Sequence, residues 1–387
     1  MDRKAAAFVA ATLALTGSSG AWARADMPPI RIGIIQVLSG PQAGVMKPSI
    51  AAPLAYQKLH GDTIAGRKIE IIVRDEGGPN PEVAKRLAQE LIVQDHVDFI
   101  VGPVNSANAA AIGPVSAEAK VPMILINSPS GNLLDKTPFA VRLSYTDAQT
   151  VVPLATWARR NGITKAYAIF LDYGPGIDGG SAFEKAFTTG GGTIVGERRV
   201  PLTNIDYSAY VQRIKDAKPQ AILAIVSAGG GGRAFLKAFS DAGLDKAGVK
   251  VLASSGLTIE NQLPALGDLA EGVYATTDYA LQRDSTENRE AIAAITAIAG
   301  EPPDFGAIAY FDAMHAIYAA VAAQHGALDP NKSLDLLRHT KFISPRGPIA
   351  VDPESRDIVQ NVYIVRTQRK GNKSVNALIA TFPAVRP

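Results

Sequence analysis

Residues 31–41 read Arg-Ile-Gly-Ile-Ile-Gln-Val-Leu-Ser-Gly-Pro, an apolar β-rich run that stops at a Gly-Pro turn. Similar runs recur through the first three quarters of the chain, and none alternates cleanly between apolar and polar residues. This pattern is typical of strands that are covered on both faces, as in parallel sheets. The other runs are 68–73, 98–102, 122–126, 166–170, 221–226, 249–253 and 272–276.

Segments with helical spacing of apolar residues lie between these runs, for example 81–94 and 208–217. Strand and helix therefore alternate along the chain, which favours βαβ units in doubly wound parallel sheets with helices on both faces. After residue 276 three helical stretches are predicted, at about 286–299, 304–323 and 331–339. The C-terminal segments 347–352, 358–367 and 376–382 read as antiparallel strands joined by polar turns.

The N-terminal segment predicts export from the cytoplasm. Asp2, Arg3 and Lys4 precede an apolar run that is too short to cross a bilayer, and Ala23 and Ala25 are the small residues that a signal peptidase reads. We expect residues 1–25 to be a signal peptide and the protein to be periplasmic. The chain contains no cysteine, which excludes a lipid anchor at cysteine, disulfides and thiolate metal sites.

The length of 387 residues exceeds the roughly 250–300 residues at which single cores stop growing, so we expect two lobes. Chain crossings between the lobes are predicted near residues 142–147, 277–283 and 344–345, and they would together form a hinge. Under this division residues 26–143 and 281–343 form lobe 1, whereas residues 144–280 and 344–387 form lobe 2.

Several function classes lack their sequence signals. The formal net charge is +3 and no run of Lys or Arg marks a phosphate-tracking surface, so nucleic acid is not an expected partner. The chain has no Gly-x-Gly-x-x-Gly after its first strand, no Gly-x-Ser-x-Gly, and five histidines without metal-ligand spacing. We therefore predict no enzyme activity, no catalytic residues, no bound metal and no cofactor.

Residues 31–41, together with Asp98-Phe-Ile-Val-Gly-Pro103 and Val121-Pro-Met-Ile124, closely resemble the type I periplasmic binding proteins of the leucine/isoleucine/valine-binding class. The likeness covers nearly the whole chain after residue 25. It implies a monomer that captures a zwitterionic or carboxylate solute between two lobes, closes on it and delivers it to an ABC permease in the inner membrane.

The resemblance also implies a site for the carboxylate. Residues 102–108 follow a strand and open a helix, whose positive N-terminal end suits an anion. Ser106 matches the family serine that hydrogen-bonds the carboxylate, although it could also cap its own helix. Asn127, Ser128 and Ser130 follow the next strand, where a backbone group at Ser128 and the Ser130 hydroxyl would complete the site. Tyr173 matches the family position of an aromatic residue that closes over the ligand. Alternatively, it is an exposed surface residue on a glycine-rich turn without a role in binding.

Two departures from the family pattern concern the ligand's identity. Ser255 stands where the family has an acidic partner for an α-ammonium, and an unpaired buried ammonium is costly, so an ordinary amino acid is disfavoured unless Asp278 substitutes. Ser227 opens the run Ser-Ala-Gly-Gly-Gly-Gly and Val45 replaces an aromatic residue, which leaves volume in the site. Both departures favour an aromatic or other bulky carboxylate, with branched-chain amino acids as the alternative. A ligand-sensing module for periplasmic signalling would use the same fold.

Overall fold

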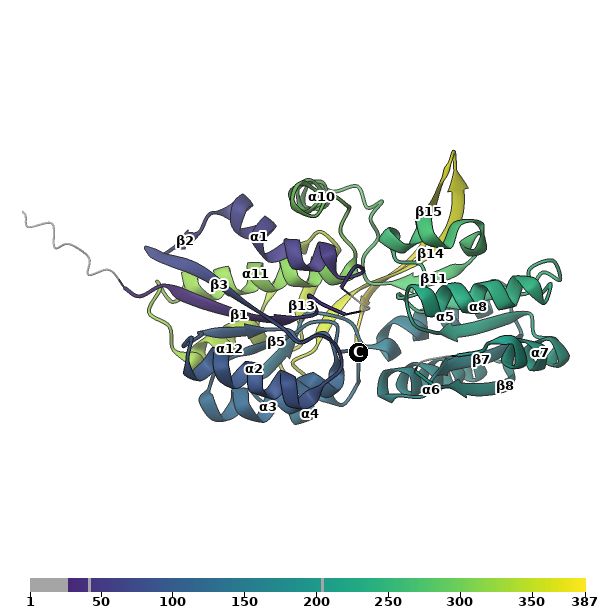
Figure 1. Ribbon diagram of the computed structural model, residues 1–387, viewed down its shortest axis with the longest axis horizontal. Helices are drawn as coiled ribbons and strands as arrows, with labels where there is room; N and C mark the ends of the chain where they lie inside the picture. Colours follow the sequence, from purple (N-terminus) through teal and green to yellow (C-terminus); the bar gives the residue numbers. More distant parts are fainter. Residues whose placement is uncertain (1–26, 41–42, 203–204) are drawn as a thin grey trace, which may run out of the picture.

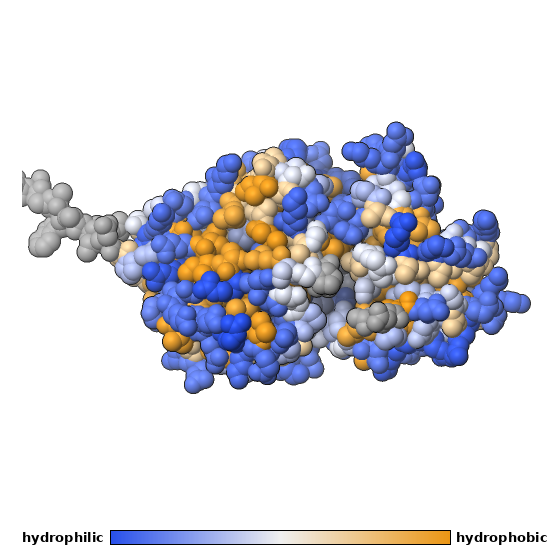
Figure 2. Space-filling view, viewed as in Figure 1, coloured by the Kyte–Doolittle hydropathy of each residue, from blue (hydrophilic) through white to orange (hydrophobic). Residues whose placement is uncertain are grey.

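The computed structural model describes residues 27–40, 43–202 and 205–387. The expected signal peptide lies outside these residues. Figure 1 shows two α/β lobes side by side, and Figure 2 shows a mostly polar surface with a notch between the lobes. The predicted fold class of two doubly wound lobes is confirmed.

Lobe 1 is built on a six-stranded sheet in which β1, β3, β4, β5 and β6 run parallel and only β2 is antiparallel. Apart from the longer and more polar β3, these strands are mostly apolar, as expected for strands that helices cover on both faces. The order across the sheet is β2 (Thr63–Ile64), β3 (Arg67–Asp75), β1 (Ile30–Gln36), β4 (Phe99–Val101), β5 (Met123–Leu125) and β6 (Ala140–Arg142).

The helices of lobe 1 begin where capping residues and prolines predict. Asn80 caps one helix by accepting a hydrogen bond from the Val83 backbone N–H, and Pro81 follows at its first turn. The helices are α1 (Lys47–His60), α2 (Pro81–Val93), α3 (Ser106–Ala119), α4 (Leu133–Lys136), α10 (Thr286–Ala299), α11 (Phe305–Ala323) and α12 (Pro330–Arg338). Helix α11 is long and apolar enough to cross a membrane, but 83% of its most apolar window is buried inside lobe 1.

Lobe 2 continues the pattern with parallel strands β7 (Lys165–Leu171), β8 (Thr193–Val200), β9 (Ala221–Ile225), β10 (Lys250–Ala253) and β11 (Tyr274–Thr277). The strands β14 (Ile358–Lys370) and β15 (Lys373–Val385) add an antiparallel hairpin at the edge of β11. Its helices are α5 (Asp147–Arg160), α6 (Gly174–Thr189), α7 (Ser208–Ala217), α8 (Gly230–Asp241) and α9 (Leu263–Leu266), with short 3-10 turns at Glu260–Gln262 and Gly267–Ala270.

The chain passes between the lobes through residues 143–146, through residues 278–285 and again in the C-terminal segment. In that segment β12 (Lys341–Ser344) and β13 (Gly347–Val351) pair antiparallel, and β13 also pairs with β14, so both strands extend the nine-stranded sheet. Ile349, Val351 and Ile358 are buried in the lobe 1 core cluster, which removes more apolar surface from water than an exposed linker would. Residues 347–351 therefore pack against the lobe 1 core and at the same time hydrogen-bond to the sheet that continues into lobe 2, and the expected lobe boundary near residues 344–345 stays a prediction.

Candidate ligand-binding site

Two loops at the carboxyl ends of β4 and β5 place serines next to each other in lobe 1. The Ser130 backbone N–H donates to the Ser106 Oγ at 3.2 Å, at the first turn of α3. Ser128 is fully buried and its Oγ donates to the Pro103 carbonyl at 3.0 Å, so its hydroxyl fastens the two loops together. Ser106 and Ser130 thus form one cluster, with Ser128 behind it.

The start of α6 in lobe 2 faces this serine cluster. A Cβ placed on Gly174 would be 3.1 Å from the Ser130 Oγ, and the Gly131 backbone N–H donates to Asp178 Oδ2 at 3.3 Å. Tyr173 immediately precedes α6 as its N-cap residue. The N-terminal ends of α3 and α6 therefore meet at Ser130, and each end carries the partial positive charge of a helix N-terminus.

Asn127 lies beside the lobe passage and not among the serines. Its backbone N–H donates to the Ser144 Oγ at 3.1 Å, and its side-chain amide lies 2.6 Å from where a Cβ on Gly306 would be. Its Oδ1 is buried without a hydrogen-bond partner among the described residues. Asn127 therefore lies at the edge of the site, next to the start of α11.

A second region of interlobe contact forms around the loop that follows β10. The Asn261 side chain donates to the Val45 carbonyl at 3.1 Å, and Ile259 is buried in the lobe 1 core cluster. Ser255 lies in the same loop with its Oγ buried and unpaired among the described atoms. Ser227 lies two residues after the end of β9 in lobe 2 and is followed by Ala228, which packs against the lobe 1 core. Val45, Ser227 and Ser255 are thus all near the boundary between the lobes.

A small cavity of about 10 Å³, room for about one water molecule, adjoins Ser255. Its wall combines residues of the β10 loop, residues of β11, β14 and β15, and one aromatic ring from lobe 1. The lining residues are Ser255, Thr258, Glu260, Ala275, Thr276, Thr277, Phe305, Val365 and Asn376. Since Phe305 begins α11, both lobes contribute to this cavity.

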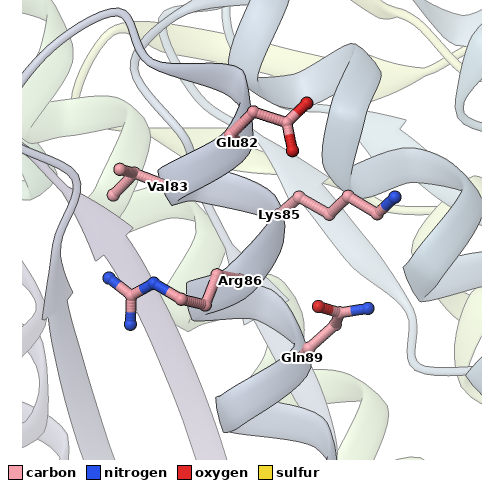
Figure 3. A pocket seen from close by; sticks show the side chains of 5 residues that line it. All are labelled: Glu82, Val83, Lys85, Arg86 and Gln89. Carbon is pink, nitrogen blue, oxygen red and sulfur yellow. The ribbon is translucent and has the colours of Figure 1, made fainter.

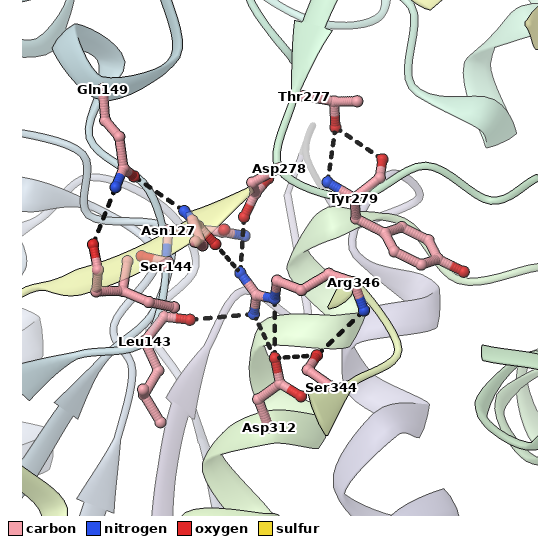
Figure 4. A network of polar contacts seen from close by, with 12 residues as sticks. Asn127, Leu143, Ser144, Gln149, Thr277, Asp278, Tyr279, Asp312, Ser344 and Arg346 are labelled. Atoms are coloured by element: carbon pink, nitrogen blue, oxygen red, sulfur yellow. Dashed lines mark hydrogen bonds and ion pairs between the residues drawn. The ribbon is translucent and has the colours of Figure 1, made fainter. Parts of the chain in front are cut away.

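Asp278 pairs with a buried arginine, so it is not available to bind the α-ammonium of a ligand. Its carboxylate pairs with the Arg346 guanidinium at 2.7 Å, and both side chains are buried. Arg346 also pairs with Asp312 at 2.8 Å and donates to the Leu143 carbonyl at 3.1 Å and the Gln360 side chain at 3.0 Å (Figure 4). Arg346 thus holds together the three places where the chain passes between lobes, and Asp278 is part of that hinge.

Several residues of the interlobe region were missed by sequence reasoning. Tyr145 and Phe305 stack edge to face with ring centroids 5.4 Å apart, although they come from the first passage and from α11. Asp147, Glu260 and Asp304 bring buried carboxyls to the same region. Only Asp304 carried a local signal, since it caps α11 by accepting from the Ala307 backbone N–H at 2.7 Å.

Burial shifts the protonation of these carboxyls. It raises the pKa of Asp147 to about 7, an effect reinforced by the negative charge of Asp178, and it raises the pKa of Glu260 to about 7. Burial also raises the pKa of Asp304 to about 6 and the pKa of the Tyr173 hydroxyl well above its usual range. The region therefore carries less negative charge near neutral pH than its acid content indicates, which is compatible with an anionic ligand.

A second hollow at the protein surface is a weaker candidate for a ligand-binding site. A hollow along α2 is lined by side chains from a single helix, Glu82, Val83, Lys85, Arg86 and Gln89, which spread apart in Figure 3. Such a helix face lacks the convergent polar groups of a small-molecule site. Among residues 27–40, 43–202 and 205–387, no group of three or more His, Cys, Asp or Glu side chains is placed to hold a metal ion.

The sequence of this chain matches a family of known proteins. A family model described as "Periplasmic binding protein" matches residues 29–372. The chain belongs to the periplasmic binding protein family. It is 37% identical to Leu/Ile/Val-binding protein homolog 6 of Brucella melitensis over 91% of this chain and 90% of that protein.

Two similar solved structures are ABC transporter solute-binding proteins of Rhodopseudomonas palustris. One, in complex with 4-hydroxybenzoate, is 36% identical, with a TM-score of 0.88 over 92% of this chain and 98% of that chain. The other, from strain BisB5 in complex with 3,4-dihydroxybenzoic acid, is 39% identical, with a TM-score of 0.87 over the same shares. The resemblance to the leucine/isoleucine/valine-binding class is thereby confirmed.

For this periplasmic binding protein the raised pKa of Asp147 has a measurable consequence. An unfolded Asp loses its proton near pH 3.9, whereas folded Asp147 keeps its proton up to about pH 7. The folded state then binds more protons between these values, so the contribution of Asp147 to the free energy of unfolding falls as the pH rises from about 4 to 7. We expect Asp147→Asn to reduce the loss of stability between pH 5 and pH 8, as measured by urea denaturation.

The exposed variant Asp241→Asn is the control for this measurement. It should retain the pH dependence of the unaltered protein. If Asp147→Asn shows the same change of stability between pH 5 and pH 8 as that control, then folded Asp147 is already ionised in this range.

Proposed function

We propose that this protein is the periplasmic substrate-binding subunit of an ABC importer and that it captures an aromatic carboxylate between its lobes. The observation that carries the proposal is the pairing of Ser106 and Ser130 in front of the starts of α3 and α6. Two hydroxyl groups and two helix N-terminal ends suit a carboxylate that bridges the lobes. The mature protein would act in the periplasm after removal of residues 1–25.

The commitment of Asp278 to Arg346 supports an aromatic acid over an amino acid. Asp278, the acid expected to substitute as partner of an α-ammonium, already neutralises a buried guanidinium and is not free to take that role. Ser255 offers a buried hydroxyl without a partner among the described atoms where the family has an acid. The hydroxybenzoates bound by the two Rhodopseudomonas palustris proteins support the same class of solute.

Ligand binding would close the two lobes by a hinge motion. The hinge is formed by the connecting segments that Arg346 joins. A ligand that touches both Ser130 of lobe 1 and the start of α6 in lobe 2 has contacts that an open form lacks. It therefore shifts the population towards the closed form, which the membrane permease of the importer would recognise. No chemical change of the solute is needed.

A thermal-shift screen of the protein purified from the periplasm tests this proposal. The panel contains 4-hydroxybenzoate, 3,4-dihydroxybenzoate, benzoate, phenylalanine and leucine. A ligand present at 100 times its Kd stabilises the folded state by about 2.7 kcal/mol. We expect stabilisation by the aromatic acids and none by the amino acids, and stabilisation by leucine alone would contradict the proposal.

The variant Ser106→Ala tests the position of the carboxylate. Loss of a hydrogen bond to a charged group should weaken binding by about 1–3 kcal/mol, which calorimetric titration measures directly. Ser208→Ala, which removes an exposed serine hydroxyl at the start of α7, is the matched control and should bind like the unaltered protein. Equal affinity of the two variants would show that the carboxylate binds elsewhere.

A further inference from the structure

The order of strands in lobe 2 separates two polar regions of the interlobe site. The sheet runs β11, β10, β9, β7 and β8, so the loops after β7 and after β10 flank the loop after β9. Neighbouring strands lie about 4.8 Å apart, which puts the ends of β7 and β10 about 10 Å apart. The β7 loop leads to Gly174 at the serine cluster, whereas the β10 loop carries Ser255 and Glu260.

The β10 loop contains polar atoms that face the cavity described above. Ser255 is 5% exposed and its Oγ has no partner among the described atoms. The Glu260 carboxyl, although the residue is partly exposed, lines the same cavity and accepts a hydrogen bond from the Asn376 side chain at 3.2 Å. Asn376 is held in turn by the Thr258 carbonyl at 2.7 Å. The cavity wall is therefore fixed in place and leaves the Ser255 hydroxyl free.

The region between the two polar ends has small or apolar side chains. After β9 the chain continues with Ser227 and Ala228, and Ala228 packs against the lobe 1 core. From lobe 1, Phe305 closes the cavity and its ring lies against Tyr145. An aromatic ring would find flat apolar partners here, between a carboxylate end and a hydroxyl end.

We propose that Glu260 and Ser255 form a second polar subsite, which recognises an uncharged hydroxyl group on the ligand ring, opposite the carboxylate. This inference rests on the proposed function and adds to it a preference for para-hydroxylated aromatic acids. Glu260 is then a specificity-determining residue of the site.

The separation of the serine cluster from the Glu260 subsite argues against two other classes of ligand, amino acids and dicarboxylates. An α-ammonium is attached to the carbon next to the carboxyl group, so a ligand whose carboxylate binds at the β7 end of the site keeps its ammonium at that end, whereas Glu260 belongs to the loop after β10, two strands away. A second carboxylate on the ligand would meet Glu260 and the nearby Asp304, and like charges at close range are unfavourable. A phenol hydroxyl avoids both problems, because it can donate to an ionised Glu260 or accept from a protonated one.

Calorimetric titration with 4-hydroxybenzoate, benzoate and benzene-1,4-dicarboxylate tests the subsite. The readout is the ratio of the Kd for benzoate to the Kd for 4-hydroxybenzoate, since loss of a hydroxyl partner changes this ratio whereas a general defect does not. We expect Glu260→Leu to lower this ratio about tenfold, and Ser255→Ala to lower it to a smaller extent. Glu260→Gln should keep most of the preference and admit the dicarboxylate more readily.

The controls separate failure of the subsite from failure of the proposed function. Glu271→Gln removes an exposed carboxylate of lobe 2 that does not line the cavity, and it should leave the ratio unchanged. If the unaltered protein binds benzoate and 4-hydroxybenzoate equally, or if Glu260→Leu leaves the ratio unchanged, the subsite is wrong and the proposed function stands. If the unaltered protein binds neither acid, the proposed function itself is wrong.

Discussion

Replacement of Arg346 by Leu should lower the free energy of unfolding by about 3–5 kcal/mol, because it leaves two buried carboxylates without a cation. Arg346 is fully buried and pairs with both Asp278 and Asp312, each of which has one carboxyl oxygen without a partner among the described atoms. The same substitution removes the hydrogen bonds that join the guanidinium to Leu143 and Gln360. Urea denaturation monitored by circular dichroism measures the change.

Arg369 supplies the matched control for this prediction. It pairs with Asp268 at the surface of lobe 2, with both side chains at least half exposed, so Arg369→Leu should cost no more than about 1 kcal/mol. The variant Arg346→Lys keeps the charge but loses the planar fork, and we expect an intermediate loss. If Arg346→Leu is as stable as Arg369→Leu, the buried carboxyls are already neutral and the hinge does not depend on this ion pair.

Gly102→Ala should be similarly damaging for a steric reason. Gly102 directly follows β4 with φ at 113°, and a Cβ there would lie 2.1 Å from the backbone carbonyl oxygen of Ile35. Backbone cannot yield as a side chain can, so the overpacking and the unfavourable φ should together cost about 3–5 kcal/mol. Because Gly102 precedes the loop to Ser106, binding of the aromatic acid should also weaken. Thermal unfolding and calorimetric titration measure the two effects.

Gly61→Ala separates the steric contribution from the conformational one. Gly61 ends α1 with φ at 88°, and no atom lies within 4 Å of the position of an added Cβ. This variant should therefore lose about 1–3 kcal/mol, the conformational cost of a side chain at φ 88° and ψ 164° without a steric clash. An equal loss at the two positions would mean that the Ile35 carbonyl moves to accommodate the methyl group.

The order of strands and helices was predictable because local patterns determine it. Apolar runs without alternation predicted the parallel strands, and the structure has them at nearly the expected residues, for example β9 at Ala221–Ile225. The helices α7 and α10 have the predicted bounds, 208–217 and 286–299. The lobe boundary near residues 344–345 stays a prediction, because β13 packs against the lobe 1 core and pairs with β14 in the nine-stranded sheet.

The candidate site was only partly predictable from the chain. Ser106, Ser128 and Ser130 could be found because they follow predicted strands, and parallel strands bring their carboxyl ends to one edge of the sheet. Glu260 and Tyr145 carried no such signal, since each lies in a loop whose path depends on the other lobe. The roles assigned to individual residues in ligand binding stay predictions until the titrations above are made.

By itself the sequence determined the fold class, the likeness to a family and the loops that reach the sheet edge, because periodicity, capping and turn residues act over a few neighbouring positions. Only the tertiary structure decided which charged groups meet. Asp278 and Arg346 are 68 residues apart in the chain, and their ion pair exists because three separate passages between the lobes converge on one buried point. No local pattern encodes such a pairing, since its energy depends on the low-dielectric surroundings that the folded lobes create.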